Sequence, residues 1–481
     1  SDLNIRSYRE FQRKVPISTY DDMLTWIEPL LRDSNLSLTK DPVMAFEKTG
    51  GSTQANKFIP FTKSFMAEIN AVTNGWIHDV YRRHPSLLGT QSYWSISPLM
   101  RDAEVTPGGT RIGLASDAEY FGPLSRLFLK HFISVPQSVS LIKDMGEWRR
   151  ATCRHLVASR NLGLISVWSP SFLTLLMDEI RDHFDEFLYA LPPEHQNQVN
   201  RDLDRYGLIC GEVFWPRLGL VSCWTDGISQ EFLPNLKAYF PTVKIQPKGL
   251  MATEGVVSVP FGDGPGSPIA VNGHFLEFMP EDKRSANPLL ADELRRGGVY
   301  SPILTTANGF LRYHLQDLVE CVGTEGKTPR IRFLRKQDRS CDLAGEKLTL
   351  GRVQEAMDAV LSAMPIPFEF MMMAPSLQPA SAPRYVLFLE SSVSDLMVDR
   401  FTKALEGELQ RSHHYKYCRD LGQLGSLQVS RVQQAMFTYQ KTLMAQGQRL
   451  GDIKPTRFDH RRIWPAAFST KHTSGAEAAR L

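Results

Sequence analysis

The sequence predicts an α/β protein with a large N-terminal domain and a small C-terminal domain. Apolar residues at helical spacing alternate along the chain with short apolar runs that are bounded by turn residues. This alternation of helices and strands is typical of α/β folds, in which helices flank β-sheets. The chain has 481 residues, which is too long for one ordinary hydrophobic core, so we expect two domains.

The spacing of apolar residues predicts individual helices and strands. Apolar residues from Phe65 to Val80 recur every three or four positions and predict a helix. A second run, from Phe172 to Phe187, has the same spacing, with Glu179 as its one polar member. Short apolar segments are expected to form buried strands, among them 164–168, 218–224, 243–246, 318–322 and 385–389.

The domain boundary is expected where an apolar strand gives way to a polar run. Residues 331–334 are predicted to form that strand, and the five residues that follow are polar or charged, which suits a hinge between two cores. We therefore expect a large domain over 1–335 and a small domain over 336–468. Residues 469–481 are polar and have little to bury, so we expect a disordered tail.

The composition argues against several classes of protein. Hydrophobic residues make up 42% and charged residues 22% of the chain, as in globular proteins. The net charge of +3 is too small for a dedicated nucleic-acid binder. There is no run of 18 apolar residues, and residues 1–20 are too polar for a signal peptide, so we expect a cytoplasmic protein without a membrane partner. Six scattered cysteines without a CxxC pair argue against a structural zinc site.

The stretch from Thr49 to Lys57 has the composition of a phosphate-binding loop. It reads Thr-Gly-Gly-Ser-Thr-Gln-Ala-Asn-Lys, in which glycines free the backbone amides, hydroxyl groups add donors and the lysine adds charge. It is not a Walker loop, because Asn56 replaces the second glycine and Phe58 replaces the Ser/Thr that holds magnesium. Residues 58–61 also look extended, whereas a Walker loop leads into a helix. Taken alone, the stretch is equally consistent with an ordinary Gly/Ser turn.

A second candidate stretch runs from Lys248 to Gly255, after the strand expected at 243–246. Its Thr253-Glu254 pair lies in a turn that is flanked by glycines. A hydroxyl and a carboxylate at the end of a strand are the hard oxygen ligands that a magnesium–phosphate complex needs. The alternative is a surface turn in which Glu254 is solvated.

A third candidate stretch, Arg-Tyr-His-Leu-Gln-Asp, ends at Asp317, directly before the strand expected at 318–322. An aspartate in this position can accept hydrogen bonds from both hydroxyls of a ribose, as carboxylates do in other nucleotide-binding folds. The alternative is an aspartate that only caps the strand.

These three stretches occur in the order and approximate spacing found in the adenylate-forming superfamily of acyl-CoA synthetases, adenylation domains and luciferases. Within it, the chain resembles the auxin-responsive acyl-acid amido synthetases, especially their bacterial members. The family motifs read roughly Thr-Ser-Gly-Ser-Thr-Gly-x-x-Lys, Ser/Thr-Glu-Gly and Arg-Tyr-x-x-Gly-Asp, and 49–57, 253–255 and 312–317 match them. Gln54 and Gln316 stand where those motifs have glycine. The resemblance covers about residues 10–460.

The resemblance implies a site for ATP and Mg²⁺. Ser52, Thr53 and Lys57 would hold the polyphosphate. Thr253 would contact the α-phosphate, and Glu254 would bind the magnesium ion.

The resemblance also implies contacts further along the chain. Ala252 would add to the nucleotide site, and Asp317 would hold the ribose. Lys336 would be the basic hinge residue that helps to bind the ribose, with Arg335 as a rival assignment. Lys454, framed by a glycine and a proline, would be a lysine of a mobile small domain that approaches the α-phosphate.

The acyl pocket is expected to draw on Tyr93, Trp94, Ser95 and Trp168. Aromatic walls suit an aryl or apolar acid. The alternative is that these residues belong to the ordinary core.

The resemblance implies an ATP-dependent ligase that makes an acyl-adenylate from a carboxylic acid and transfers the acyl group to an amine, such as an amino acid. One alternative is an acyl-CoA ligase, which shares the adenylation step. A second alternative, motivated by Gln54 and Gln316, is a catalytically weakened protein that binds an acyl group or a nucleotide.

Overall fold

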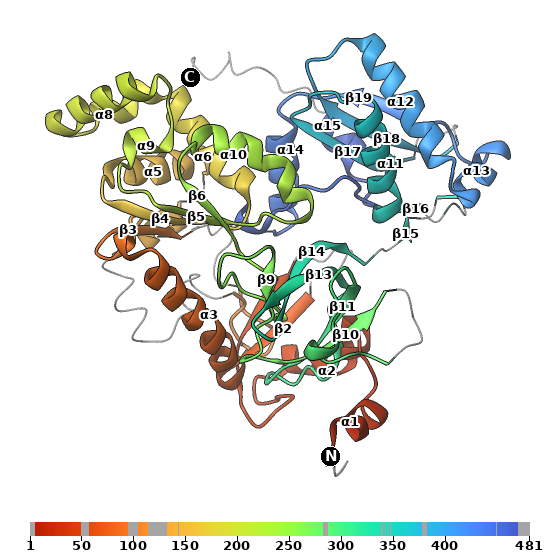
Figure 1. Ribbon diagram of the computed structural model, residues 1–481. Coiled ribbons are helices and arrows are strands. Elements are labelled where there is room, and N and C mark those ends of the chain that lie inside the picture. Colours follow the sequence, from red (N-terminus) through yellow and green to blue (C-terminus); the bar gives the residue numbers. More distant parts are fainter. Residues whose placement is uncertain are drawn as a thin grey trace. The chain divides into compact units, whose positions relative to one another are not determined.

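Figure 1 shows a computed structural model of the chain. The structure describes residues 5–49, 57–94, 104–113, 132–142, 144–281, 287–337, 340–341, 343–344, 346, 348–377, 382–448 and 450–469. The chain divides into two compact units. The first unit comprises 1–337 with 448–452, and the second comprises 338–447 with 453–481.

The first unit contains a four-stranded parallel sheet. Its strands are β3 (Gln91–Trp94), β4 (Leu162–Ser166), β5 (Leu220–Cys223) and β6 (Lys244–Pro247), in that order across the sheet. The strands expected at 164–168, 218–224 and 243–246 are therefore confirmed. In Figure 1, helices α5 (Met145–Ala158), α6 (Pro170–Asp182) and α10 (Leu233–Tyr239) lie on the side of this sheet opposite to α3 (Lys63–Arg83).

The predicted helix from Phe65 to Val80 is confirmed as α3. The hydroxyl of Thr62 caps it by accepting a hydrogen bond from the amide of Phe65 at 3.3 Å. Its apolar face packs into one hydrophobic core with strands of both sheets of this unit. The second helical run is divided, because His183 (φ −122°, ψ 32°) leaves the helical conformation between α6 and α7 (Phe184–Tyr189). The apolar spacing continues across this break because both helices bury residues in the core.

The second sheet of this unit is antiparallel. The order of the strands across this sheet is β10 (Phe275–Pro280), β11 (Val299–Thr305), β13 (Asp317–Glu325), β14 (Thr328–Lys336) and β9 (Ser267–Pro268). A sixth strand, β12 (Tyr313–His314), pairs with β11. The strand expected at 318–322 is therefore confirmed within β13. β14 continues through Arg335 and Lys336, so the polar run that was expected to form the hinge begins inside a strand.

Two hairpins and several short helices complete the first unit. The hairpins are β1 (Val43–Thr49) with β2 (Lys57–Thr62), and β7 (Met251–Ala252) with β8 (Gly255–Val256). The remaining α-helices described in this unit are α1 (Tyr8–Lys14), α2 (Tyr20–Arg32), α8 (Pro193–Tyr206) and α9 (Gly211–Phe214).

The second unit is built on the sheet β17 (Phe370–Ser376), β18 (Arg384–Glu390) and β19 (Gln428–Arg431), which confirms the strand expected at 385–389. β17 and β18 are antiparallel, and β19 is parallel to β18. Its other elements are β15 (Ser340–Cys341), β16 (Leu348–Thr349), α11 (Leu350–Ala363), α12 (Asp395–Leu409), α13 (His413–Asp420), α14 (Ala435–Ala445) and α15 (Trp464–Ser469). The expected disordered tail falls, after Ser469, outside the described residues.

None of the helices in the described ranges is both long and apolar enough to cross a bilayer. The six cysteines are all buried, and none of them forms a disulfide bond.

Candidate functional site

Lys57 is the first residue of β2 and pairs with Thr49 at the end of the β1–β2 hairpin. The extended conformation expected after this residue is confirmed, and it distinguishes the stretch from a Walker loop, which leads into a helix. Ser52 and Thr53, the expected polyphosphate contacts, lie outside the described residues, as does Gln54.

Glu254 lies in the two-residue turn between β7 and β8, next to the half-buried Thr253 and Ala252. Only 8% of Glu254 is exposed, so the alternative of a solvated surface turn is wrong. The hairpin packs closely against β11: a Cβ atom on Gly255 would lie 2.6 Å from Cδ2 of Leu304. Glycine is therefore required directly after the turn.

Tyr313 joins Lys57 to Glu254. Nζ of Lys57 donates a hydrogen bond to Oη of Tyr313 at 3.1 Å, and this hydroxyl donates to Oε1 of Glu254 at 3.2 Å. Nζ of Lys57 lies 3.6 Å from the same carboxylate oxygen. Burial, followed by the charge and hydrogen bond of Glu254, raises the pKa of Tyr313 well above its usual value, so the phenol stays protonated. We call these three residues the lysine–glutamate cluster.

Tyr20, at the start of α2, completes the surroundings of Lys57. Nζ of Lys57 lies 5.4 Å from the ring centroid of Tyr20 and 5.8 Å from that of Tyr313, so two aromatic faces stabilise the cation. The amide of Phe58 donates a hydrogen bond to Oη of Tyr20 at 2.6 Å, which fixes this ring to β2. Neither tyrosine has a role that was predicted from the sequence. Tyr313 could have been found within its motif, whereas nothing in the sequence links Tyr20 to Lys57.

Asp317 and Lys336 meet across two neighbouring strands. Asp317 begins β13, Lys336 ends β14, and the two residues are partners in the register of the sheet. Nζ of Lys336 lies 3.1 Å from Oδ1 of Asp317, which is only 4% exposed. Arg335, the rival of Lys336, pairs instead with Leu318 in the register, and its guanidinium lies 3.1 Å from Glu281.

Gln316 adopts a left-handed backbone conformation, with φ of 60°. Its carbonyl accepts a hydrogen bond of 2.7 Å from the amide of Gln337. Glycine adopts this conformation without the steric cost that a side chain brings. The left-handed turn therefore explains why the family motif has glycine at this position. Gln316 adopts the same turn at a steric cost.

Arg312, the first residue of the third motif, has a structural role. Its Nε and Nη2 atoms donate to the two carboxylate oxygens of Glu277 at 2.9 and 3.0 Å. Its Nη1 atom donates to the carbonyl oxygens of Gln12 and Val15, at 2.9 and 2.7 Å. Arg312 therefore fastens the N-terminal segment to the antiparallel sheet, while Tyr313 and Asp317 of the same motif belong to the candidate site.

Lys454 belongs to the second unit. Its side chain is exposed, and it stands between the buried residues Ile453 and Pro455. The carbonyl of Lys454 accepts a hydrogen bond of 2.9 Å from Oη of Tyr439. The backbone of Lys454 is thus held in place by Tyr439. The approach of Lys454 to the nucleotide stays a prediction.

The expected acyl-pocket residues lie at the carboxyl ends of the parallel strands. Tyr93 and Trp94 end β3, and Trp168 follows β4 by two residues. Parallel α/β sheets bind ligands at this edge. Trp94 and Trp168 are half-buried there. Tyr93 is fully buried, which agrees with the alternative that it belongs to the ordinary core. Ser95 lies outside the described residues.

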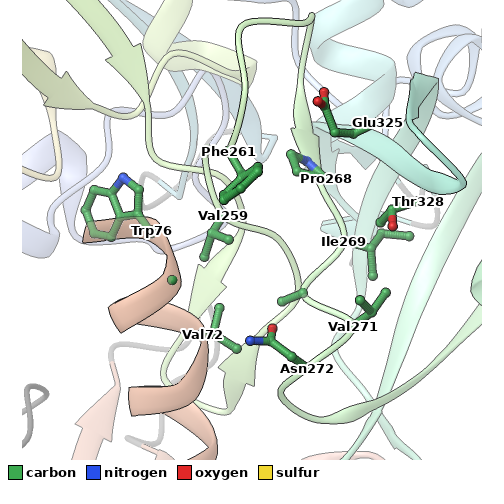
Figure 2. A pocket seen from close by; sticks show the side chains of 12 residues that line it. Val72, Trp76, Val259, Phe261, Pro268, Ile269, Val271, Asn272, Glu325 and Thr328 are labelled. Carbon is green, nitrogen blue, oxygen red and sulfur yellow. The ribbon is translucent and has the colours of Figure 1, made fainter. Parts of the chain in front are cut away.

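A separate cavity of about 340 Å³ lies between α3 and the segment that leads into and follows β9. Figure 2 shows Val72 and Trp76 on one side of it and Ile269 and Val271 on the other, with Glu325 near one end. None of the site residues predicted from the sequence lines this cavity. It is therefore not the site formed by the three motifs.

Comparison with known proteins assigns the chain to a family. Its sequence matches the GH3 family N-terminal domain over residues 2–198, the GH3 family central domain over 267–336 and the GH3 family C-terminal domain over 352–462. Together these matches cover more than half of the chain. The chain belongs to the GH3 family.

Relatives of this GH3 chain include plant proteins and solved structures. A protein of Oryza sativa subsp. japonica, provisionally named indole-3-acetic acid-amido synthetase GH3.10, is 23% identical over 377 residues, which is 74% of this chain and 77% of that protein. The structure of AtGH3.15 acyl acid amido synthetase in complex with 2,4-DB gives a TM-score of 0.78 at 15% identity, and the match covers 96% of this chain and 88% of that one. A second structure, of GH3.15 acyl acid amido synthetase, gives 0.77 at 15% identity and covers 96% and 87%.

The resemblance to the acyl-acid amido synthetases is confirmed by the three family matches. The α/β fold with an N-terminal and a C-terminal part is confirmed by the structural likeness. The expectation of an enzyme, a ligase, is confirmed at the level of the family, whose relatives are named as amido synthetases.

Proposed function

We propose that this GH3 protein is an ATP-dependent acyl acid amido synthetase. It adenylates a carboxylic acid with release of pyrophosphate and then transfers the acyl group to an amine, such as an amino acid. The observation that carries the proposal is the lysine–glutamate cluster, in which residues from all three motifs meet within 3.6 Å. The GH3 relatives, which are named as amido synthetases, support the same reaction.

The chemistry explains why such a site contains charged groups and no nucleophile of its own. A carboxylate is a poor electrophile, because its leaving group would be oxide. Attack of the carboxylate oxygen on the α-phosphorus of ATP forms the mixed anhydride and expels pyrophosphate. Negative charge then builds on the phosphoryl oxygens, so the protein contributes mainly positioning and electrostatic stabilisation.

The residues of the first unit have distinct roles in this step. Lys57 neutralises charge on the polyphosphate, and the hydroxyl of Thr253 contacts the α-phosphate next to Ala252. Asp317 accepts hydrogen bonds from the ribose hydroxyls, with Lys336 beside it. Each of these groups lies at the end of a strand or in a tight turn, which limits the freedom it loses when ATP binds.

Glu254 fits a magnesium ion. Its buried carboxylate is a hard oxygen ligand, and Mg²⁺ fills its other positions with water and substrate phosphates. Among the described residues, no group of three or more His, Cys, Asp or Glu side chains forms a metal site. When bound, the ion neutralises charge on the phosphates. Glu254 would hold this ion and would remain beside Lys57.

The second half-reaction needs no covalent bond to the enzyme, because an amine attacks the activated carbonyl directly. The cysteines do not favour an acyl-thioester route. All six are buried, and burial raises the pKa of Cys210 to about 11. We also propose a cytoplasmic location, mobility of the second unit and no nucleic-acid or membrane partner.

Pyrophosphate exchange with a panel of carboxylic acids tests the adenylation step. We expect acid-dependent incorporation of labelled pyrophosphate into ATP, and its loss in the Lys57→Met variant. The matched control is Lys327→Met, at an exposed lysine in the β13–β14 turn, at the opposite end of these strands from Asp317 and Lys336. If no acid supports exchange, the protein is better described as a catalytically weakened protein that binds an acyl group or a nucleotide.

The acceptor separates an amido synthetase from an acyl-CoA ligase. With an active acid and ATP, the enzyme is offered either a mixture of the common amino acids or coenzyme A, and mass spectrometry identifies the product. We expect an amide. A thioester as the main product would favour the ligase alternative.

A further inference from the structure

His314 belongs to the third motif but has no part in the proposed reaction. It ends the short strand β12 and is half-buried. Its Nε2 atom lies 2.7 Å from Oγ of Ser301 in β11, and this hydroxyl lies 2.9 Å from the carbonyl oxygen of Asp317. Two hydrogen bonds in series therefore connect His314 to the residue that is proposed to hold the ribose.

The direction of both hydrogen bonds follows from the number of protons. A carbonyl oxygen can only accept, so Oγ of Ser301 donates its single proton to Asp317. The same hydroxyl must then accept from Nε2 of His314. Burial lowers the pKa of His314, although the charge of Asp317 opposes this shift, so the imidazole is neutral near pH 7. The one proton of this neutral ring is therefore on Nε2.

The two hydrogen bonds span an irregular part of the antiparallel sheet. β11 pairs with β12 on one side of this part and with β13 on the other. Between the two paired regions, residues 315–318 lie opposite only residues 301–302 of β11, so the longer segment forms a bulge. Pro302 has no amide hydrogen to donate. The side chain of Ser301 instead supplies the donor for the carbonyl of Asp317.

The bulge contains Gln316, whose left-handed backbone (φ 60°) carries a steric cost. Hydrogen bonds hold the chain at this residue and directly after it. The carbonyl of Gln316 accepts from the amide of Gln337 at 2.7 Å, and the carbonyl of Asp317 accepts from Ser301. A strained residue keeps its conformation only where the surrounding structure fixes it. Glycine adopts this conformation without strain, so it would depend less on the hydrogen bonds from Ser301 and His314.

We propose that His314 is a positioning residue, which acts through Ser301 to compensate for the strain at Gln316 and to keep Asp317 in place for the ribose. This inference rests on the proposed function, because it deepens the role given to Asp317. Without the two hydrogen bonds the bulge relaxes, and the carboxylate that begins β13 directly after it shifts. With glycine at position 316, the loss of the same hydrogen bonds has little effect on Asp317.

Binding of ATP and of 2′,3′-dideoxy-ATP tests the proposal. The two nucleotides differ only in the ribose hydroxyls, and calorimetry with magnesium measures both affinities on the full chain without an acid substrate. The wild-type protein is expected to prefer ATP. His314→Phe keeps a ring but removes the donor, so ATP affinity should fall roughly 2- to 10-fold, the scale of one neutral hydrogen bond. The affinity for dideoxy-ATP should stay unchanged, because that nucleotide makes no contact with Asp317.

A second substitution separates positioning of Asp317 from general damage to the fold. When His314→Phe is combined with Gln316→Gly, ATP affinity should return to within about twofold of Gln316→Gly alone, because coupled residues give non-additive effects. Damage to the fold would persist with either residue at position 316. Ser301→Ala should reproduce the loss seen in His314→Phe, and the two changes together should cost no more than one, since they interrupt the same series of hydrogen bonds.

Two matched variants complete the test. His314→Gln places an amide donor at the same number of bonds from the backbone as Nε2, so it should retain the affinity for ATP. His84→Phe makes the aromatic substitution at another half-buried histidine, directly after α3, and should leave both affinities unchanged. If His314→Phe does not fold, Ser301→Ala decides the question, because it removes a single oxygen atom and can be combined with Gln316→Gly in the same way.

Four results would overturn the proposal: no preference for ATP in the wild type, an equal loss of affinity for both nucleotides, a loss that Gln316→Gly does not relieve, or unchanged ATP affinity in both His314→Phe and Ser301→Ala. Failure of the proposed function would look different. The two nucleotides would then bind as expected in every variant, while no acid would support pyrophosphate exchange in the wild type.

Discussion

The two units present their candidate charged groups in different ways. In the first unit, Lys57 lies beside Glu254 and Lys336 beside Asp317, within 3.6 and 3.1 Å. In the second unit, Lys454 is exposed, and its carbonyl accepts a hydrogen bond from Oη of Tyr439. Groups that are already held in place can bind ATP as it arrives, because little freedom remains to be lost.

This difference predicts how substitutions divide between binding and catalysis. A prearranged group of the first unit should affect the affinity for ATP or magnesium. A lysine that acts on the α-phosphate only while charge develops there should instead affect the rate of the chemical step. The predictions below test this division, beginning with the largest expected effect.

Lys454→Ala should lower the rate of adenylation roughly 100- to 1000-fold, near 2.7–4 kcal/mol, with ATP affinity nearly unchanged. The reason is that a positive charge delivered to the α-phosphate stabilises charge that develops only during the reaction. Single-turnover formation of the acyl-adenylate and equilibrium binding of ATP measure the two quantities separately.

The control for Lys454 uses the second half-reaction and a neighbouring lysine. A pre-formed acyl-adenylate should still react with amine in Lys454→Ala, because that step needs no help at phosphorus. Lys441→Ala, at an exposed lysine of α14, should leave both steps unchanged. Normal adenylation by Lys454→Ala would mean that the assignment of Lys454 is wrong.

Glu254→Gln should slow pyrophosphate exchange roughly a hundredfold at limiting magnesium, the scale of one pre-organised electrostatic contact. Glutamine keeps the shape of the side chain but removes the charge that faces both Lys57 and the metal ion. Raising the magnesium concentration should restore part of the rate. Glu320→Gln, at a partly exposed carboxylate of β13, is the matched control. A magnesium dependence equal to that of the wild type would exclude the metal-binding role.

Asp317→Ala should weaken ATP binding by roughly 1.5–3 kcal/mol and leave the Michaelis constant for the acid almost unchanged, since a charged acceptor for two ribose hydroxyls is lost. Lys336→Met sharpens the test because it removes the ion-pair partner of Asp317 and keeps the carboxylate of Asp317. We expect a smaller effect from Lys336→Met, because that side chain is 63% exposed and exposed ion pairs contribute little. Equal effects of the two variants would show that Asp317 acts only through Lys336.

The motif residues could be predicted from the sequence because each lies near the end of a strand, and local sequence patterns predict where strands end. Lys57, Glu254 and Asp317 all follow or begin segments with a clear apolar run or a turn signal. Their partners could not be predicted in the same way. The ring of Tyr20 reaches Lys57, and the guanidinium of Arg312 reaches Glu277, only through the packing of distant segments.

Burial and backbone geometry also lay outside the sequence pattern. Glu254 sits in a turn, where exposure is the common outcome, yet the packing of its hairpin against β11 covers it. The helical spacing from Phe172 to Phe187 gave no sign of the break at His183, because helices on both sides face the core. His314 stands at an open position of the third motif, and only the fold places Ser301 between it and Asp317.

Gln316 offers the smallest and most local test, because its side chain stands on a left-handed backbone directly before Asp317. Glycine at this position removes a steric cost of roughly 1–2 kcal/mol but loses about 0.5–1 kcal/mol to the greater freedom of the unfolded chain. Gln316→Gly should therefore stabilise the first unit slightly, by roughly 0.5 kcal/mol, whereas Gln316→Ala keeps the strain and should not. Calorimetry of thermal unfolding measures the stability of both variants. Because the two substitutions are at the same position, the contacts of the surrounding residues are the same in both. If ATP affinity rises in Gln316→Gly and not in Gln316→Ala, the strained turn also limits how Asp317 reaches the ribose. If the alanine variant is as stable as the glycine variant, the left-handed turn carries no strain, and the glycine of the family motif needs another explanation.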